Sequence, residues 1–454
     1  MKPIHANELL AGLTLAEPVL VTSVVTDSRK VEPGCVFVCF PGERVDGHDY
    51  AAAAYKAGAV YVIANHPVDG VPEDRTVIVP SSHKAMVRMA ANYRTLFSPL
   101  MIGVTGSVGK TTTKEFCYAV LSAFGDTLKT EGNQNNEIGL PNTLFRMDDT
   151  TEYAVVEMGM SNLGEIERLT RAARPSAGII TMIGVCHLEN LGTRENILKA
   201  KLEICAGLPD GAPLVLNADD DLLPTAKLPG RLCPVWFGID AENAEVRAEK
   251  LAETAGGISF VIHDTEHGDF PAHIPTIGRH TVYDALAAYA AATRLGLDPA
   301  RAAAALDHYE TAGMRQHVVE KNGVTVIEDC YNASPDSMKA ALQVLKNMPQ
   351  KRHFALLGDM LELGSVSEQA HREVGDWAAE TGVFTLIAYG PLSAATAEEA
   401  KQKGVTSVHC QNAQEVVQFL RQNVHPGDAL LAKASHAMKL EEILAAFYEW
   451  AGKA

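Results

Sequence analysis

The chain has 454 residues, which is too many for a single hydrophobic core, and a prior of roughly 150 residues per domain suggests about three domains. With 47% hydrophobic and 21% charged residues, its composition is that of an ordinary globular protein. The formal charge of −17 at pH 7 excludes the broad basic surface that nucleic-acid binding requires, so no nucleic-acid partner is expected.

The first part of the chain, residues 1–98, predicts a small α/β domain. Residues 35–40 are typical of a strand, an Ala-rich helix is expected at residues 50–57, and a second strand is expected at residues 59–63. Ser98 precedes a proline, and such a residue avoids the helical region of backbone space. We therefore predict a domain boundary there.

Residues 99–313 predict a central domain built on a parallel sheet. Its continuous apolar runs are typical of buried parallel strands and occupy residues 100–104, 153–156, 178–183 and 213–216. Helical stretches separate some of these runs. The pattern favours a P-loop-type α/β domain that ends near Gly313.

Residues 314–454 predict a third, doubly wound domain of the Rossmann-like type. Apolar runs occupy residues 324–327, 354–357, 384–388 and 429–431. Helical patterns lie between them, and one such pattern places Met338, Ala341, Leu342 and Leu345 on a single face. The fold class expected for the whole chain is therefore α/β, in three domains.

The strongest local motif is a glycine-rich loop between an apolar strand and an amphipathic helix. Its residues are Thr105, Gly106, Ser107, Val108, Gly109, Lys110, Thr111 and Thr112. Glycines let backbone N–H groups face phosphate oxygens, and the helix N-terminus adds positive potential. Lys110 is expected to reach the outer phosphates of a nucleotide, and the Thr111 hydroxyl to bind Mg²⁺. The strict G-x-x-x-x-G-K-[ST] pattern fails at Val104, and the loop alone leaves a kinase, a nucleotide hydrolase and a ligase open.

The spacing of the cysteines and the hydropathy of the chain indicate the cellular compartment in which the protein is expected. The eight cysteines include no C-x-x-C pair, and their irregular spacing favours reduced thiols over a disulfide or zinc framework. The first residues lack the apolar core of a signal peptide, and no apolar run approaches the ~18 residues that a membrane span needs. We expect a cytoplasmic protein with no membrane span.

The loop and several later motifs together resemble the Mur ligase family and its folylpolyglutamate synthetase relatives. The motifs are T-G-S-V-G-K-T-T at 105–112, G-N-Q-N-N-E-I-G-L-P at 132–141, V-V-E-M-G-M at 155–160, H-L-E-N at 187–190 and K-A-K-L-E-I at 199–204. The resemblance implies that Thr111, Glu157 and His187 serve magnesium ions. It also implies a carbamate on Lys201, which would position a second magnesium. Asn133, Asn135 and Asn136 of the second motif are expected to contact the substrate.

Each of these residues has a simpler interpretation when it is taken alone. Glu157 and His187 could be ordinary polar residues at strand ends. Lys201 could be a solvated lysine on a helix. The order and spacing of the motifs favour the functional interpretation for all three.

The first domain contains T-D-S-R at 26–29, G-C-V-F at 34–37 and G-E-R-V-D-G-H at 42–48, which resemble the UDP-binding domain of the family. Ser28 and Arg29, together with Gly47 and His48, are expected to bind the UDP-linked substrate. The alternative interpretation of this region is a turn with a surface ion pair.

Two C-terminal motifs resemble the family branch that adds D-alanyl-D-alanine. They are D-C-Y-N-A-S-P-D-S at 329–337 and G-D-M-L-E-L-G at 358–364. By this resemblance, Arg315 approaches the γ-phosphate, Asp329 approaches the nucleotide ribose, and Tyr331 and Asn332 lie near the active cleft. Ser334 and Pro335 also make a good helix start, so part of the first motif is structural.

Two positions depart from the family pattern. Relatives often have G-x-H-N-x-x-N-A-L-A where residues 278–287 have G-R-H-T-V-Y-D-A-L-A, so Asp284 replaces an amide donor expected at the adenine. At residues 433–436 the chain has K-A-S-H where K-G-S-R is usual, and His436 carries a weaker, pH-dependent charge.

The resemblance implies an enzyme that uses ATP and Mg²⁺ to join D-alanyl-D-alanine to UDP-N-acetylmuramoyl-tripeptide through an acyl-phosphate. A monomer is expected, although the sequence itself carries no sign of the oligomeric state. The expected catalytic residues are Lys110, Glu157, His187, Lys201 and Arg315. The neighbouring ligase that adds the third stem amino acid and a non-catalytic nucleotide sensor are the alternatives. A sensor would be expected to lose Lys110, Glu157 or Lys201, and all three are present.

Overall fold

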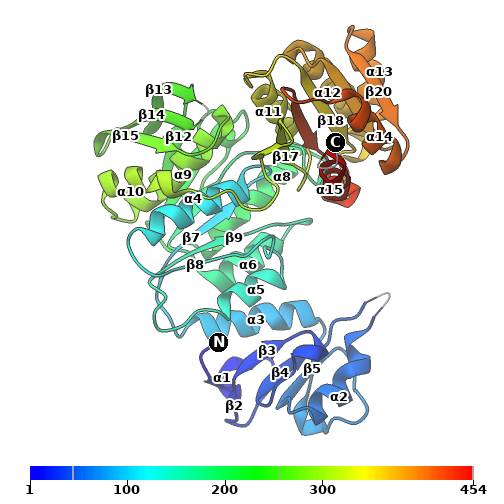
Figure 1. Ribbon diagram of the computed structural model, residues 1–454. Helices are drawn as coiled ribbons and strands as arrows, with labels where there is room; N and C mark the ends of the chain where they lie inside the picture. The colour runs from blue at the N-terminus through cyan, green and yellow to red at the C-terminus, as the bar shows by residue number, and fades with distance from the viewer. Residues whose placement is uncertain (43–44, 255, 452–454) are drawn as a thin grey trace.

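The computed structural model describes residues 1–42, 45–254 and 256–451, apart from the side chains of residues 450 and 451. Three α/β units follow one another along the chain and lie from the bottom to the top of Figure 1. Each unit is built on one main sheet, of four, nine and six strands respectively. The predicted α/β fold class is confirmed, whereas the exact boundaries at residues 98 and 313 stay predictions.

The N-terminal unit has a four-stranded parallel sheet in the order β3-β4-β5-β6, beside an antiparallel pair, β1-β2. The strands are β1 (Ile4–His5), β2 (Leu20–Val21), β3 (Ser23–Val25), β4 (Cys35–Val38), β5 (Tyr61–Ala64) and β6 (Thr76–Ile78), and the helices are α1 (Ala6–Leu9), α2 (Ala51–Lys56) and α3 (Ser82–Arg94). Ser81 begins α3 by accepting a hydrogen bond from the backbone N–H of Lys84. The two strands and the helix predicted between residues 35 and 63 are confirmed, with slightly different ends.

Helix α3 joins the N-terminal unit to the middle unit. Tyr93 on this helix is buried, and its hydroxyl donates to the carbonyl of Met147 at 2.7 Å. Arg94 donates to the carbonyl of Ala173 at 2.9 Å. Buried side chains of both units therefore form one continuous hydrophobic cluster across this junction.

The middle unit has a nine-stranded sheet in the order β15-β14-β13-β12-β11-β10-β7-β9-β8. Its strands are β7 (Leu100–Thr105), β8 (Thr127–Lys129), β9 (Tyr153–Glu157), β10 (Ala177–Ile180), β11 (Pro213–Asn217), β12 (Cys233–Gly238), β13 (Val246–Thr254), β14 (Gly257–Asp264) and β15 (Gly268–Ile274). Its helices are α4 (Lys110–Ser122), α5 (Gly139–Leu144), α6 (Glu165–Ala173), α7 (Leu188–Leu191), α8 (Arg194–Leu202), α9 (Arg279–Arg294) and α10 (Pro299–Ala305). The four predicted strands are β7, β9, β10 and β11, and they pair in parallel as expected.

The middle sheet is not parallel throughout. Strands β13, β14 and β15 form an antiparallel meander at one edge. Their burial alternates along much of each strand, because one face packs against α9 and α10 while the other is largely exposed. These strands therefore lack the continuous apolar runs that are typical of buried parallel strands.

The C-terminal unit has a six-stranded sheet in the order β16-β17-β21-β18-β19-β20, with only β16 antiparallel to its neighbour. The strands are β16 (His317–Lys321), β17 (Val324–Asp329), β18 (His353–Gly358), β19 (Thr385–Tyr389), β20 (Thr406–Cys410) and β21 (Ala429–Lys433). The helices are α11 (Pro335–Lys346), α12 (Ser367–Thr381), α13 (Ala394–Gln402), α14 (Ala413–Asn423) and α15 (Leu440–Ala451). One face of the sheet is covered by α11, α12 and α13 and the other by α14 and α15, which confirms the doubly wound arrangement.

The carboxyl ends of strands from the two larger sheets approach each other between the middle and C-terminal units (Figure 1). Strand β9 ends at Glu157 and β17 ends at Asp329, and both residues line one cavity there. Open α/β sheets bind ligands at this edge. In the described part of the chain, no helix is long and apolar enough to cross a membrane, and all eight cysteines are free thiols.

Candidate active site

A cavity of about 460 Å³ lies between the middle and C-terminal units. The predicted site residues that line it are Ser107, Val108, Gly109, Lys110, Thr111, Thr112, Asn133, Asn135, Asn136, Glu157, His187, Asp284, Arg315, Asp329, Tyr331 and Asn332. Thr105, Gly106 and Lys201 lie behind this lining, and the four predicted residues of the N-terminal unit are not part of it.

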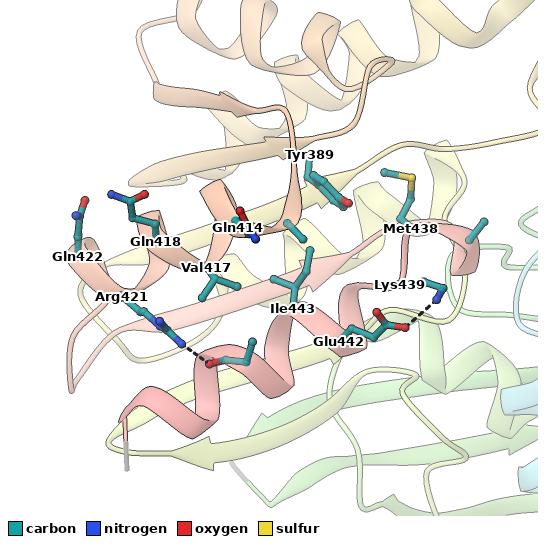
Figure 2. A pocket seen from close by; sticks show the side chains of 13 residues that line it. Tyr389, Gln414, Val417, Gln418, Arg421, Gln422, Met438, Lys439, Glu442 and Ile443 are labelled. Carbon is teal, nitrogen blue, oxygen red and sulfur yellow. Dashed lines mark hydrogen bonds and ion pairs between the residues drawn. The ribbon is translucent and has the colours of Figure 1, made fainter. Parts of the chain in front are cut away.

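A larger groove, of about 870 Å³, lies on the C-terminal unit between α14 and α15. Figure 2 shows that Gln414, Gln418 and Gln422 of α14 form one wall, with Ile443 and Glu442 of α15 opposite. None of the predicted site residues lines this groove. We therefore place the active site in the smaller cavity, where the motif residues converge.

The phosphate loop requires glycine at two positions. Gly106 has φ +148°, and a Cβ atom there would lie 1.9 Å from the Thr181 hydroxyl oxygen. Gly109, with φ +88°, is the N-cap of α4. Lys110 Nζ donates to the carbonyls of Gly106 at 3.0 Å and Ser107 at 3.3 Å, which holds the ammonium group over the loop. This loop presents the free N–H groups of a helix N-terminus together with a cation, as phosphate binding requires.

Glu157 is buried at the end of β9 and accepts two hydrogen bonds. Thr111 Oγ1 donates to its Oε2 at 2.8 Å, and Asn135 Nδ2 donates to its Oε1 at 2.7 Å. Thr130 Oγ1 accepts from the backbone N–H of Glu157 at 3.1 Å. The structure thus brings together two of the predicted magnesium residues, Thr111 and Glu157, and places Asn135 as a support of the carboxylate.

These oxygen atoms fit a magnesium ion that is held partly by a nucleotide. Mg²⁺ prefers hard oxygen ligands and usually binds through one or two protein groups, phosphate oxygens and waters. Thr111 and Glu157 supply a hydroxyl and a carboxylate on the wall of the phosphate cavity. Within the described residues, no group of three or more His, Cys, Asp or Glu side chains could form an all-protein metal cage.

Lys201 is a buried lysine of α8, with 1% of its surface exposed. Burial, and then the nearby charge of Lys110, hold the pKa of its amino group well below the ordinary lysine value. The interpretation of Lys201 as a solvated helix lysine is therefore wrong. A neutral lysine amine is the form that can react as a nucleophile.

The C-terminal unit contributes a stack of side chains and a buried ion pair. The Arg315 guanidinium lies 3.8 Å from the centroid of the Tyr331 ring, and the His436 ring stacks on Tyr331 at a centroid distance of 5.4 Å. Lys433 Nζ donates to Asp329 at 2.6 Å and to the carbonyl of Asn332 at 2.9 Å. Lys433 lines the cavity and was not predicted as a site residue, although it begins the K-A-S-H motif.

Asp284 lies beneath the phosphate loop. Its Oδ1 accepts a hydrogen bond from Thr113 Oγ1 at 2.6 Å, and a Cβ atom on Gly109 would lie 2.6 Å from the same oxygen. Burial raises the pKa of this carboxyl to about 8, against a smaller lowering by the hydrogen bond from Thr113. Near neutral pH the group is therefore largely protonated and can donate a hydrogen bond, as an asparagine side chain also can.

We expect Asp284→Asn to stabilise the protein at pH 8. Between pH 4 and pH 8 the unfolded chain has lost this proton while the native protein keeps it, so the native state becomes less stable as pH rises, up to the native pKa of about 8. Asparagine removes this dependence of about 1.4 kcal/mol per pH unit, so its gain in the free energy of unfolding should be about 4 kcal/mol larger at pH 8 than at pH 5. Urea unfolding at pH 5 and pH 8 measures it, with the exposed Asp69→Asn as control. An equal effect of Asp284→Asn at both pH values would contradict the explanation.

The predicted UDP-binding residues lie in the N-terminal unit. Arg29, whose side chain is 87% exposed, pairs with Asp27 at 2.7 Å, beside Ser28 in a short 3-10 turn. His48 is buried, with Nδ1 2.5 Å from the Asp46 carboxylate and Nε2 accepting from the backbone N–H of Asn65.

The Arg29 pair has the geometry of the alternative interpretation, a turn with a surface ion pair. A Cβ atom on Gly47 would lie 2.8 Å from the backbone nitrogen of Phe40, so this position requires glycine for close packing. Substrate binding by Ser28, Arg29, Gly47 and His48 stays a prediction. Glu43 and Arg44 of the same motif lie outside the described residues.

Comparisons with known proteins place the chain in a family. Three family descriptions match it: "Mur ligase family, catalytic domain" over residues 20–94, "Mur ligase middle domain" over 104–292, and "Mur ligase, glutamate ligase domain" over 314–436. A UDP-N-acetylmuramoyl-tripeptide--D-alanyl-D-alanine ligase of Bacillus subtilis (strain 168) is 39% identical over 448 residues, which cover 96% of each chain.

Solved structures agree with the sequence relatives. A crystal structure of MurF from Acinetobacter baumannii superposes with a TM-score of 0.91 at 28% identity and covers 99% of both chains. A MurF ligase from Thermotoga maritima in complex with ADP gives a TM-score of 0.84 at 29% identity, covering 95% of this chain and 98% of that one. With the phosphate loop, Glu157 and the C-terminal motif residues around one cavity, these likenesses show that the chain belongs to the Mur ligase family.

Proposed function

We propose that this Mur ligase uses ATP to join D-alanyl-D-alanine to UDP-N-acetylmuramoyl-tripeptide, giving the pentapeptide precursor of peptidoglycan. The observation that carries the proposal is the convergence of the phosphate loop, Glu157 and the motif at 329–337 on one cavity. The relative from Bacillus subtilis that is named for this reaction matches 96% of the chain, so the sequence likeness extends through all three units. ADP in the Thermotoga maritima structure supports ATP as the nucleotide.

The reaction has two chemical steps. First, the substrate carboxylate attacks the γ-phosphorus of ATP, and the bond to the bridging oxygen breaks to release ADP and leave an acyl-phosphate. Then the free amine of D-alanyl-D-alanine attacks the acyl carbon, and phosphate leaves as the peptide bond forms while the amine loses a proton. Both steps develop negative charge on oxygen. Lys110 and the N–H groups at the start of α4 lie where they can stabilise that charge, and no enzyme nucleophile is required.

Several other residues have proposed roles in holding the reactants. Thr111, Glu157 and His187 would hold Mg²⁺, which supplies charge neutralisation at the phosphates when it is bound. Arg315 would approach the γ-phosphate, and its stacking on Tyr331 limits the positions of the guanidinium. Asp329 would contact the ribose, although its ion pair with Lys433 already occupies one carboxylate oxygen.

The proposed carbamate on Lys201 has its own test. Neutral Nζ attacks the carbon of CO₂, the nitrogen loses one proton, and a carbamate anion forms on a side chain whose pKa burial holds well below the ordinary lysine value. With ¹³C-labelled bicarbonate, we expect one protein carbamate signal in the ¹³C spectrum. The signal should disappear in Lys201→Arg and persist in Lys199→Arg, because Lys199 is exposed on the same helix. A signal that survives Lys201→Arg would assign the carbamate to another site.

The proposed reaction is tested with the purified protein, ATP, Mg²⁺ and UDP-N-acetylmuramoyl-tripeptide, with and without D-alanyl-D-alanine. Phosphate release that depends on the dipeptide, matched by pentapeptide in the mass spectrum, is the expected result. Both the lysine and the diaminopimelate tripeptides are needed as substrates. Phosphate release without the dipeptide, or no pentapeptide from either tripeptide, would rule the proposal out and leave the neighbouring ligase or a nucleotide sensor.

We further propose that the ligase acts as a monomer in the cytoplasm, with the three domains at residues 1–98, 99–313 and 314–454. Eight free cysteines suit a reducing compartment. ATP and a UDP-linked substrate are also consistent with that location.

A further inference from the structure

Two residues with left-handed backbone conformation meet where the middle and C-terminal units are in contact. His187 has φ +61° at the N-cap of α7, and Glu362 has φ +64° in the loop after β18. Seven non-glycine residues in the described part of the chain have positive φ, and these two belong to different units. Their side chains meet, with His187 Nδ1 2.8 Å from Glu362 Oε2. Backbone strain of this kind persists where the surrounding structure enforces it, often at functional sites.

The loop that carries Glu362 fits closely against the middle unit. Gly364 has φ +57°, and a Cβ atom there would lie 3.1 Å from the Cα of Glu189 on α7. The backbone N–H of Glu189 donates to the carbonyl of Glu362 at 3.4 Å. The contact between His187 and Glu362 is therefore part of a docked interface, in which both backbones are held in place.

The Glu362 side of the pair is exposed, although the Nδ1 atom of His187 is buried, and this exposure limits what the contact adds to stability. The Glu362 side chain is 61% exposed and that of His187 is 26% exposed. Exposed ion pairs contribute little to folding stability. Among the described residues, Glu362 makes no other salt bridge, so its carboxylate is available to orient the imidazole.

The chemistry of the imidazole gives the pair a role. In the neutral ring, the nitrogen beside a carboxylate carries the proton and the other nitrogen keeps its lone pair. Carboxylates that accept the outer N–H of a metal-binding histidine fix its tautomer and its ring orientation. The Nδ1 atom of His187 is buried and forms no aligned hydrogen bond with the described residues, although Glu362 Oε2 lies 2.8 Å away. A proton held on Nδ1 by this carboxylate would leave Nε2 as the nitrogen able to bind a metal, on a residue that lines the cavity.

We propose that Glu362 is a positioning residue that accepts Nδ1–H of His187 and so prepares Nε2 for the divalent cation. Because Glu362 belongs to the C-terminal unit and His187 to the middle unit, the histidine is oriented only when the two units are docked. The cation site and the docking of the C-terminal unit are thereby coupled. This inference rests on the proposed function, in which His187 serves magnesium.

The test compares Glu362→Ala with Glu362→Gln, using Mn²⁺ as the probe and the full chain in complex with ADP. We expect Glu362→Ala to weaken Mn²⁺ affinity by about 10-fold or more, measured by the free Mn²⁺ signal in electron paramagnetic resonance. Glu362→Gln should lose less, because the amide oxygen still accepts the N–H. Glu368→Gln is the matched control, since Glu368 is an exposed carboxylate of the same unit that pairs with Arg372.

Several results would overturn the inference. Unchanged Mn²⁺ affinity in Glu362→Ala would show that the carboxylate does not position the histidine. An equal loss in Glu368→Gln, or a loss that follows a lowered urea midpoint, would indicate a general structural effect. Because the Mn²⁺ measurement needs no turnover, its outcome does not depend on the outcome of the ligation assay. Pentapeptide formation by the wild-type protein with normal Mn²⁺ binding in Glu362→Ala would refute the inference and leave the proposed function intact.

Discussion

Lys110→Ala is expected to lower kcat by about three orders of magnitude, at the upper end of what one preorganised donor contributes. The ammonium group is held at 3.0 Å from the carbonyl of Gly106 and at 3.3 Å from that of Ser107, so it is positioned before the nucleotide binds. Negative charge develops on the γ-phosphate oxygens during transfer, and the variant has no cation at that place. Lys110→Arg should not restore the rate, because the planar guanidinium cannot occupy the position of a compact ammonium group.

The measurement is dipeptide-dependent phosphate release at saturating ATP and Mg²⁺, with the pentapeptide followed in parallel. Lys84→Ala is the matched control, because Lys84 is exposed on α3 of the N-terminal unit. Urea unfolding checks that both variants fold. A kcat within tenfold of wild type for Lys110→Ala would show that the loop does not act on the transferred phosphate.

Glu157→Gln is expected to lower kcat by about 100-fold or more and to raise the Mg²⁺ concentration that gives half-maximal rate. The carboxylate accepts from both Thr111 Oγ1 and Asn135 Nδ2, one on each oxygen. An amide has only one acceptor oxygen, so its NH₂ group must face one of these two donors. The variant should therefore also lose about 1–3 kcal/mol of unfolding free energy.

Titration of activity with Mg²⁺ separates the lower kcat from the higher Mg²⁺ requirement. Added metal can compensate for weaker metal binding, but it cannot restore a rate that is lost because the charge is misplaced. Glu167→Gln is the control, since Glu167 is a partly exposed carboxylate on α6 that pairs with Arg171. If Glu157→Gln kept wild-type kcat and the same Mg²⁺ requirement, the assignment of Glu157 to the metal site would be wrong.

The phosphate loop and the parallel strands could be predicted from the sequence because their causes are local. The loop conformation at Gly106 and Gly109 depends on glycine backbone freedom at two positions, and α4 follows directly. Strands such as β7 and β9 are continuous apolar runs because both faces of the sheet are covered. The antiparallel meander of β13, β14 and β15 escaped prediction, since its alternating burial depends on which face meets α9 and α10.

The family motifs identified most residues of the cavity, but not how they contact one another. Asn135 was expected at the substrate and lies against Glu157. Lys433 had no predicted role, and its partner Asp329 is 104 residues away in the chain. For Ser28, Arg29, Gly47 and His48, the surrounding structure explains local contacts but does not test a role in binding.

By itself, the sequence determined the α/β class, the order of the motifs and the glycine-rich loop, because short-range backbone preferences and apolar patterning act within a few residues. The tertiary structure alone decided which polar groups lose water and which meet a partner. It buried Lys201 and Asp284. Burial lowers the pKa of the lysine and raises the pKa of the aspartate, and both shifts favour the uncharged form. It also placed Glu362 beside His187, across two units. Desolvation and charge pairing depend on residues distant in the chain, so the chemistry of the site was settled by packing.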